Sequence, residues 1–190
     1  VTVSLDIFAQ AEAGYDYTKI YLEVDSPYAK ILLNGPNGHD LAGTIAAGVI
    51  TPEHFVSAPV TNSQFGGGTS PKTFRIIIEF VSDIAVSDFS GLDTEYGAVC
   101  LDEVTVTGNI SRTVASWAFT ADLEGWTAGV LPGIGSFLGL GNRELDYTVA
   151  DPCACSLTGG VLEMHNASYL HVDGQQEQLN SPIVARKVDM

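Results

Sequence analysis

The chain has 190 residues with 8 Lys+Arg against 23 Asp+Glu, so its formal net charge is −15, while 45% of its residues are hydrophobic and only 16% are charged. Eight scattered cations cannot form the basic face that nucleic-acid binding needs, and apolar runs such as 76–78 are far shorter than the roughly 20 residues that span a bilayer. We therefore expect a globular domain that binds no nucleic acid, inserts into no membrane and buries a substantial core.

Several segments alternate between apolar and polar residues, the pattern of a half-buried strand. In chain order they are 1–7, 19–24, 74–80, 103–106 and 144–149, followed by the shorter apolar clusters 161–164, 169–172 and 182–185. Turn clusters rich in Gly, Asn and Pro separate them, and the Ala/Gly-rich stretch 41–49 is the one segment with a helical character. Many short strands between such turns predict an all-β fold, an antiparallel β-sandwich of the jelly-roll type.

Two groups of motifs resemble a known family. The segments 80–83, 91–98 and 101–108 (FVSD, GLDTEYGA and LDEVTVTG) resemble the closing strands of extracellular jelly-roll modules related to MAM domains, of the choice-of-anchor J type. The segments 117–119 and 123–127 (WAF and LEGWT) resemble the opening strand of the same module, and the element LNSPIV at 179–184 resembles the end of its first half. The resemblance implies an extracellular or cell-surface location.

The order of these motifs is the reverse of the family's arrangement. Closing motifs lie in 1–108 and opening motifs in 109–190, and joining Met190 to Val1 would restore the family order. The chain is therefore expected to be a closing half followed by an opening half, starting inside a strand pattern at Val1. Four interpretations remain open: one period of a tandem array, a circularly permuted domain, a subunit whose opening half completes its neighbour, or a complete domain with chance motif matches. Exchange between neighbours is a head-to-tail contact that propagates into a filament unless it closes.

Carboxylates near the junction of the halves suggest a calcium site. Strict alternation places Asp102 on the same face as Val104, and a carboxylate buried there would need neutralising. Ca²⁺ takes six to eight oxygen ligands and is a suitable counter-ion; the alternative is a β-bulge that turns Asp102 into solvent. The resemblance also implies a structural Ca²⁺ here, and the candidate ligands are Asp102, Glu103, Thr120, Asp122 and Glu124.

Other chemical signals are weaker. Cys153 and Cys155 flank one residue, too close for an ordinary unstrained bridge although such rings exist, and one of them could pair with Cys100, which would leave the other free or intermolecular. Asn109 and Asn166 begin glycosylation sequons. The four histidines have no zinc-ligand spacing, and nothing singles out a pair of catalytic acids. We therefore expect no enzyme.

These observations predict a structural or adhesive module of a surface or filament protein, stabilised by Ca²⁺, whose partners are copies of itself. The alternative is a carbohydrate-binding module of a secreted hydrolase. Glycans would then bind at a rim of loosely placed aromatic rings, for which the candidates are Tyr15, Tyr17, Tyr28 and Tyr96.

Overall fold

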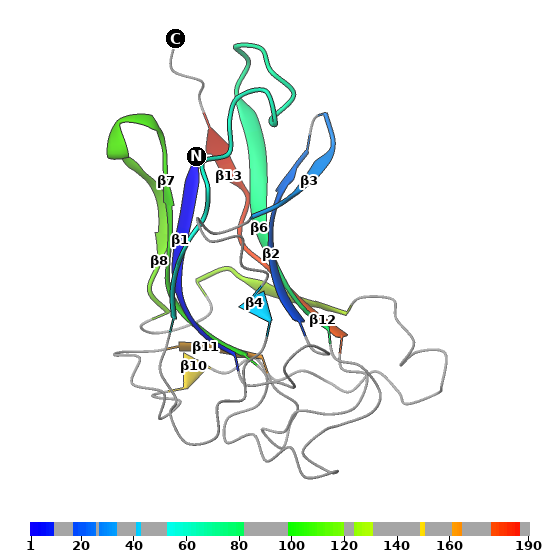
Figure 1. The fold of residues 1–190 in the computed structure, drawn as a ribbon, viewed down its shortest axis with the longest axis vertical. Coiled ribbons are helices and arrows are strands. Elements are labelled where there is room, and N and C mark those ends of the chain that lie inside the picture. The colour runs from blue at the N-terminus through cyan, green and yellow to red at the C-terminus, as the bar shows by residue number, and fades with distance from the viewer. Residues whose placement is uncertain are drawn as a thin grey trace.

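The described part of the chain is an antiparallel β-sandwich (Figure 1). The computed structural model describes residues 1–9, 17–25, 27–33, 41–42, 53–81, 99–119, 124–130, 149–150, 161–164 and 176–186. Within these ranges every strand pair is antiparallel, and a short 3₁₀ turn, η2 (Asn109–Ser111), is the only helical element. The prediction of an all-β antiparallel sandwich is confirmed.

The first sheet has six strands in the order β10–β11–β7–β1–β5, and β8 also pairs with β7. Its strands are β1 (Thr2–Ala9), β5 (Glu53–Val56), β7 (Val99–Thr107), β8 (Thr113–Trp117), β10 (Val149–Ala150) and β11 (Val161–Met164).

The second sheet has seven strands in the order β3–β2–β6–β12–β9, with β13 paired to β6 and β4 paired to β2. Its strands are β2 (Tyr17–Val24), β3 (Ala29–Leu32), β4 (Leu41–Ala42), β6 (Lys72–Val81), β9 (Thr127–Val130), β12 (Gln176–Asn180) and β13 (Val184–Arg186).

The core lies between the sheets and is built by the strands whose alternation is clearest in the sequence. In each of β1, β2 and β6 the apolar side chains that point inward are fully buried, and they form one cluster with Leu101, Val104 and Val106 of β7. In β1 and β2 every second residue is buried, as a period of two dictates for a sheet with one covered face, whereas the central strand β6 also buries Ile77 and Glu79. The strands predicted at 1–7, 19–24, 74–80 and 103–106 are therefore confirmed.

Both halves of the chain contribute to both sheets. In the second sheet, β6 from the range 1–108 pairs with β12 and β13 from the range 109–190. In the first sheet, β7 pairs with β8 and β11 from the later range. Neither sheet would have its present set of strands if one of the two ranges were removed.

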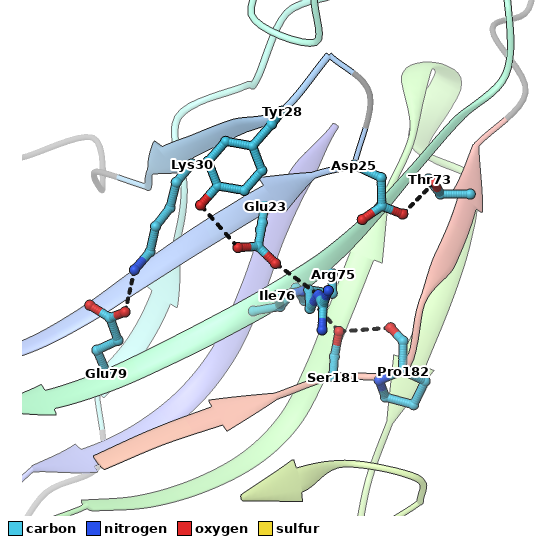
Figure 2. Close-up of polar contacts among 10 residues, drawn as sticks. All are labelled: Glu23, Asp25, Tyr28, Lys30, Thr73, Arg75, Ile76, Glu79, Ser181 and Pro182. Atoms are coloured by element: carbon cyan, nitrogen blue, oxygen red, sulfur yellow. Dashed lines mark hydrogen bonds and ion pairs between the residues drawn. The ribbon is translucent and has the colours of Figure 1, made fainter. Parts of the chain in front are cut away.

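Ser181 separates β12 from β13. Residues 176–180 pair with β6 from Val81 to Ile77, and pairing resumes between Val184 and Phe74. At the break, Ser181 N–H donates to the Ile76 carbonyl at 2.9 Å, and Ile76 N–H donates to Ser181 Oγ at 2.8 Å (Figure 2). The side chain thus replaces the carbonyl that a continuous strand would supply, which gives the Ser-Pro motif a structural role.

Replacing Ser181 with Ala should lower the free energy of unfolding by about 1–3 kcal/mol, because the buried Ile76 N–H would lose its acceptor. Urea denaturation of the two proteins measures this difference. Ser181→Thr keeps the hydroxyl and is the control, and an alanine variant as stable as the wild type would contradict the assignment.

Two details differ from the sequence-based expectations. The composition of 41–49 predicts helical character, but Leu41 and Ala42 form β4, paired with Thr18 and Tyr17, and residues 43–50 lie outside the described part. The strand predicted at 144–149 is described only at its end, as β10, and the cluster 169–172 lies outside the described residues.

Candidate functional site

The candidate site lies where a β-bulge interrupts the pairing of β1 with β7. Ser4 lies opposite Thr105, but the next residue pair in register is Asp6 with Asp102. Two residues of β7 therefore face one residue of β1, and Glu103 takes up the extra length with a φ of 49°. A bulge of this kind re-aims the neighbouring side chain.

The bulge changes the face that Asp102 occupies. Asp6 lies between the buried residues Leu5 and Ile7 and points to the outer face of the sheet, and its partner Asp102 shares that face. The expectation that Asp102 shares the face of Val104 is therefore wrong, because it assumed unbroken alternation. The expected burial holds nonetheless: Asp102 is only 3% exposed.

Burial raises the pKa of the Asp102 carboxyl to about 6. The largest cause is loss of hydration, which disfavours the ionised form, and the negative charges of Glu103, Asp6 and Glu124 act in the same direction. The Glu103 N–H donates to Asp102 Oδ1 at 2.7 Å and opposes the shift. The carboxyl is thus poised to bind a proton or a cation.

Asp102 and the three acids that raise its pKa form what we call the acidic cluster: Asp6, Asp102, Glu103 and Glu124. The Glu124 backbone has a φ of 47°, and its carboxylate accepts a hydrogen bond of 3.1 Å from the Ala118 N–H. The described strands of this sheet contain no Lys or Arg. Among the described residues, His54 on β5 brings a basic group to this cluster, and its Nδ1 is paired with Asp6 Oδ1.

The five expected calcium ligands are divided by the structure. Asp102, Glu103 and Glu124 belong to the acidic cluster, whereas Thr120 and Asp122 lie outside the described residues. Oxygen donors suit Ca²⁺, but no three His, Cys, Asp or Glu side chains in the described part are grouped closely enough to hold a metal ion. The donor chemistry therefore fits calcium, while the described side chains alone do not make a complete site.

Sequence analysis missed two members of this neighbourhood, Asp6 and His54. Asp6 sits at an outward position of a clearly alternating strand, which marks it as exposed and gives no hint of a buried neighbour. His54 is 48 residues away from Asp6 in the chain, so only the pairing of β1 with β5 brings them together.

Three aromatic rings of the opening-strand motif belong to the core cluster. Trp126 packs edge-on against Trp117, with ring centroids 5.5 Å apart, and against Phe119, at 5.7 Å. All three side chains are buried. The residues of the opening-strand motif thus pack in the core, as aromatic pairs of this geometry commonly do.

The outer face of the second sheet carries a ladder of polar contacts (Figure 2). Lys30 is paired with Glu79. The Glu23 carboxylate has two partners: its Oε2 lies 2.9 Å from Arg75 Nε, and its Oε1 accepts a hydrogen bond of 3.3 Å from the Tyr28 hydroxyl. Tyr28 is 69% exposed. Of the other rings proposed for a glycan rim, Tyr15 and Tyr96 lie outside the described residues, and the side chain of Tyr17 is also not described.

The remaining candidates are mostly outside the described part. Cys100 lies in β7, but Cys153 and Cys155 lie outside it, so the disulfide stays a prediction. Asn109 is exposed at the start of η2, where a glycan would have room, and Asn166 is not described.

Comparison of the chain with protein-family models, with curated proteins and with solved structures finds no match. The similarity to choice-of-anchor J type modules therefore remains a prediction from the motifs. No helix among the described residues has the length and apolar character needed to cross a membrane.

Proposed function

We propose that this protein is a non-catalytic extracellular module with a structural or adhesive role, which assembles with copies of itself and is stabilised by Ca²⁺. One observation carries the proposal of self-assembly: strands of the range 109–190 complete both sheets of the range 1–108. The same strand pairs would form equally well between two chains, which is how exchange of identical elements produces oligomers.

The connection between the halves is suited to exchange. It consists of Gly108 to Arg112, closed by a hydrogen bond of 2.8 Å from the Gly108 N–H to the Arg112 carbonyl. If this turn opens and the pairs of β8 and β11 with β7 and of β12 and β13 with β6 separate, the strands of 109–190 are free to leave their own chain. Their pairing with a neighbouring chain would restore the same buried contacts, so the net difference in contact energy between the closed and exchanged forms is small.

The calcium part of the proposal is supported by the buried carboxyl of Asp102 in the acidic cluster. Its neighbours on the sheet are acids, and a divalent cation would neutralise their charge, since the described strands of the first sheet contain no Lys or Arg. The role of Ca²⁺ there would be structural, since it would hold the bulge of β7 and the Glu124 turn together.

A disulfide trap tests exchange. Thr105 and Ser116 are partners across β7 and β8, with their hydroxyl oxygens 3.3 Å apart, so the double variant Thr105→Cys, Ser116→Cys should oxidise readily. Exchange predicts disulfide-linked oligomers on a non-reducing denaturing gel, because the thiol introduced on β7 of one chain would meet the thiol introduced on β8 of another.

Each single-cysteine variant serves as a control for linkage through the natural thiols. A double variant that yields only internally bridged monomers, at every protein concentration during oxidation, would refute exchange.

A further inference from the structure

Strand β8 is an open edge of the first sheet. In the part of the chain that the structure describes, its only strand neighbour is β7, and Figure 1 draws the β7–β8 hairpin at the left of the molecule. Thr113, Val114 and Ser116 are exposed, while Trp117 is buried in the core. Since no described strand pairs with its other side, the backbone groups there can accept another strand.

The edge lacks the protection that such strands usually have. Natural edge strands often carry charged side chains or proline, which discourage other strands from pairing with them. The edge strand β5 contains Glu53 and His54, and the edge strand β3 contains Lys30. The sequence of β8, TVASW, contains none and has high strand preference. The described edge strand β9 is also uncharged, but Gly129 weakens its strand preference.

We infer that β8 pairs antiparallel with β8 of a second copy of this chain, joining two first sheets into one continuous sheet. The inference rests on the proposed function, in which copies associate, and it specifies where folded copies touch. Two molecules of net charge −15 repel each other, so a contact is most favourable along a strand that carries no acid of its own, as β8 does not.

Charge complementarity favours a second copy as the occupant. In a pairing centred on Ala115, Val114 faces the partner's Ser116, and Arg112 comes level with the partner's Ala118. The Ala118 N–H is bonded to Glu124, so Arg112 would reach the partner's Glu124. Arg112 is exposed and makes no ion pair with a described residue. Because the pairing is two-fold symmetric, this ion pair would form twice, once at each end of the two paired strands.

The test compares two valines of matched exposure at opposite edges of the same sheet. Val114 on β8 is 36% exposed and Val56 on β5 is 37% exposed. Sedimentation velocity over a range of concentrations should show the wild type and Val56→Lys associating alike, whereas Val114→Lys should weaken association at least about tenfold, the loss expected from placing an unpaired charge in the contact. Arg112→Glu, in an exposed turn where folding is not at risk, should weaken association at low salt and less so at high salt.

The outcomes separate this inference from the proposed function. Association of Val114→Lys and Arg112→Glu at the wild-type strength would overturn the β8 contact, while disulfide-linked oligomers of the Thr105→Cys, Ser116→Cys variant would still support exchange. A wild type that stays monomeric at every concentration, together with a Thr105→Cys, Ser116→Cys variant that gives no linked oligomers, would overturn both.

Discussion

Replacing Asp102 with Asn should stabilise the calcium-free protein at pH 7 by up to about 3 kcal/mol, because a shift of one pKa unit corresponds to about 1.4 kcal/mol. The pKa of Asp102 is raised from 3.8 to about 6 in the folded state. Between these values the folded protein holds a proton that the unfolded chain has lost, so stability falls as the pH rises. Above about pH 6 both states are ionised, and the destabilisation is complete.

Urea denaturation of both proteins from about pH 3.5 to pH 7.5, in the presence of a chelator, measures this effect. The two proteins should be about equally stable near pH 3.5, where Asp102 is protonated in both states, and should diverge through the window from about pH 4 to pH 6. Asn keeps an oxygen that can accept the Glu103 N–H, so the local hydrogen bond is retained. Parallel stability curves at all pH values would show that the burial of this carboxyl has no energetic consequence.

Calcium should reverse the ranking of the two proteins. A cation that binds only the folded state stabilises it by about 4.1 kcal/mol when present at about 1,000 times its Kd, which exceeds the advantage of Asp102→Asn, and it needs the ionised carboxylate. Saturating Ca²⁺ at pH 7 should therefore stabilise the wild type and leave Asp102→Asn unchanged. Mg²⁺, which demands a tighter octahedral geometry, is the control. Equal shifts in both proteins would place the bound cation elsewhere.

The sequence predicts those parts of the fold in which one strand carries its own signal. β1, β2, β6 and β7 each show several inward apolar residues at a period of two, which is sufficient to identify them. β12 has no such signal, since Gln176–Asn180 contains a single apolar residue, Leu179. It is a strand because it lies between β6 and β9, and that environment depends on contacts distant in sequence.

The candidate site is predictable only in part for a related reason. The two consecutive acids at 102 and 103 are noticeable in the sequence, but their directions depend on the bulge. Glutamate has no preference for the positive φ found at Glu103, so its residue type gives no signal. The proximity of Asp6 to Asp102 depends on the register of β1 on β7, which the whole core sets.

The second large effect is expected at Trp126. Replacing it with Ala should lower the free energy of unfolding by about 3–5 kcal/mol, the range for removing a large aromatic side chain from a core. Trp126 is 2% exposed and packs against two other rings. Trp126→Phe should lower the free energy of unfolding much less, because phenylalanine fills part of the volume. This substitution also eliminates a buried indole N–H that has no hydrogen-bond partner among the described residues. Urea denaturation ranks the variants, with the exposed Tyr28→Ala as a control expected to stay within about 0.5 kcal/mol.

Hydrogen exchange measured on Trp126→Ala tests whether the ranges 1–108 and 109–190 unfold together. Trp126 and the two rings that it contacts, Trp117 and Phe119, all belong to the range 109–190. They share one core cluster with residues of β1, β2 and β6, which belong to the range 1–108. If the sandwich is one cooperative unit, the amides of β1, β2 and β6 should lose as much protection as those of β9. Faster exchange in β8, β9, β12 and β13 alone, with β1, β2 and β6 still protected, would instead mean that the strands contributed by 109–190 can detach as a group, which is the step that exchange between chains requires.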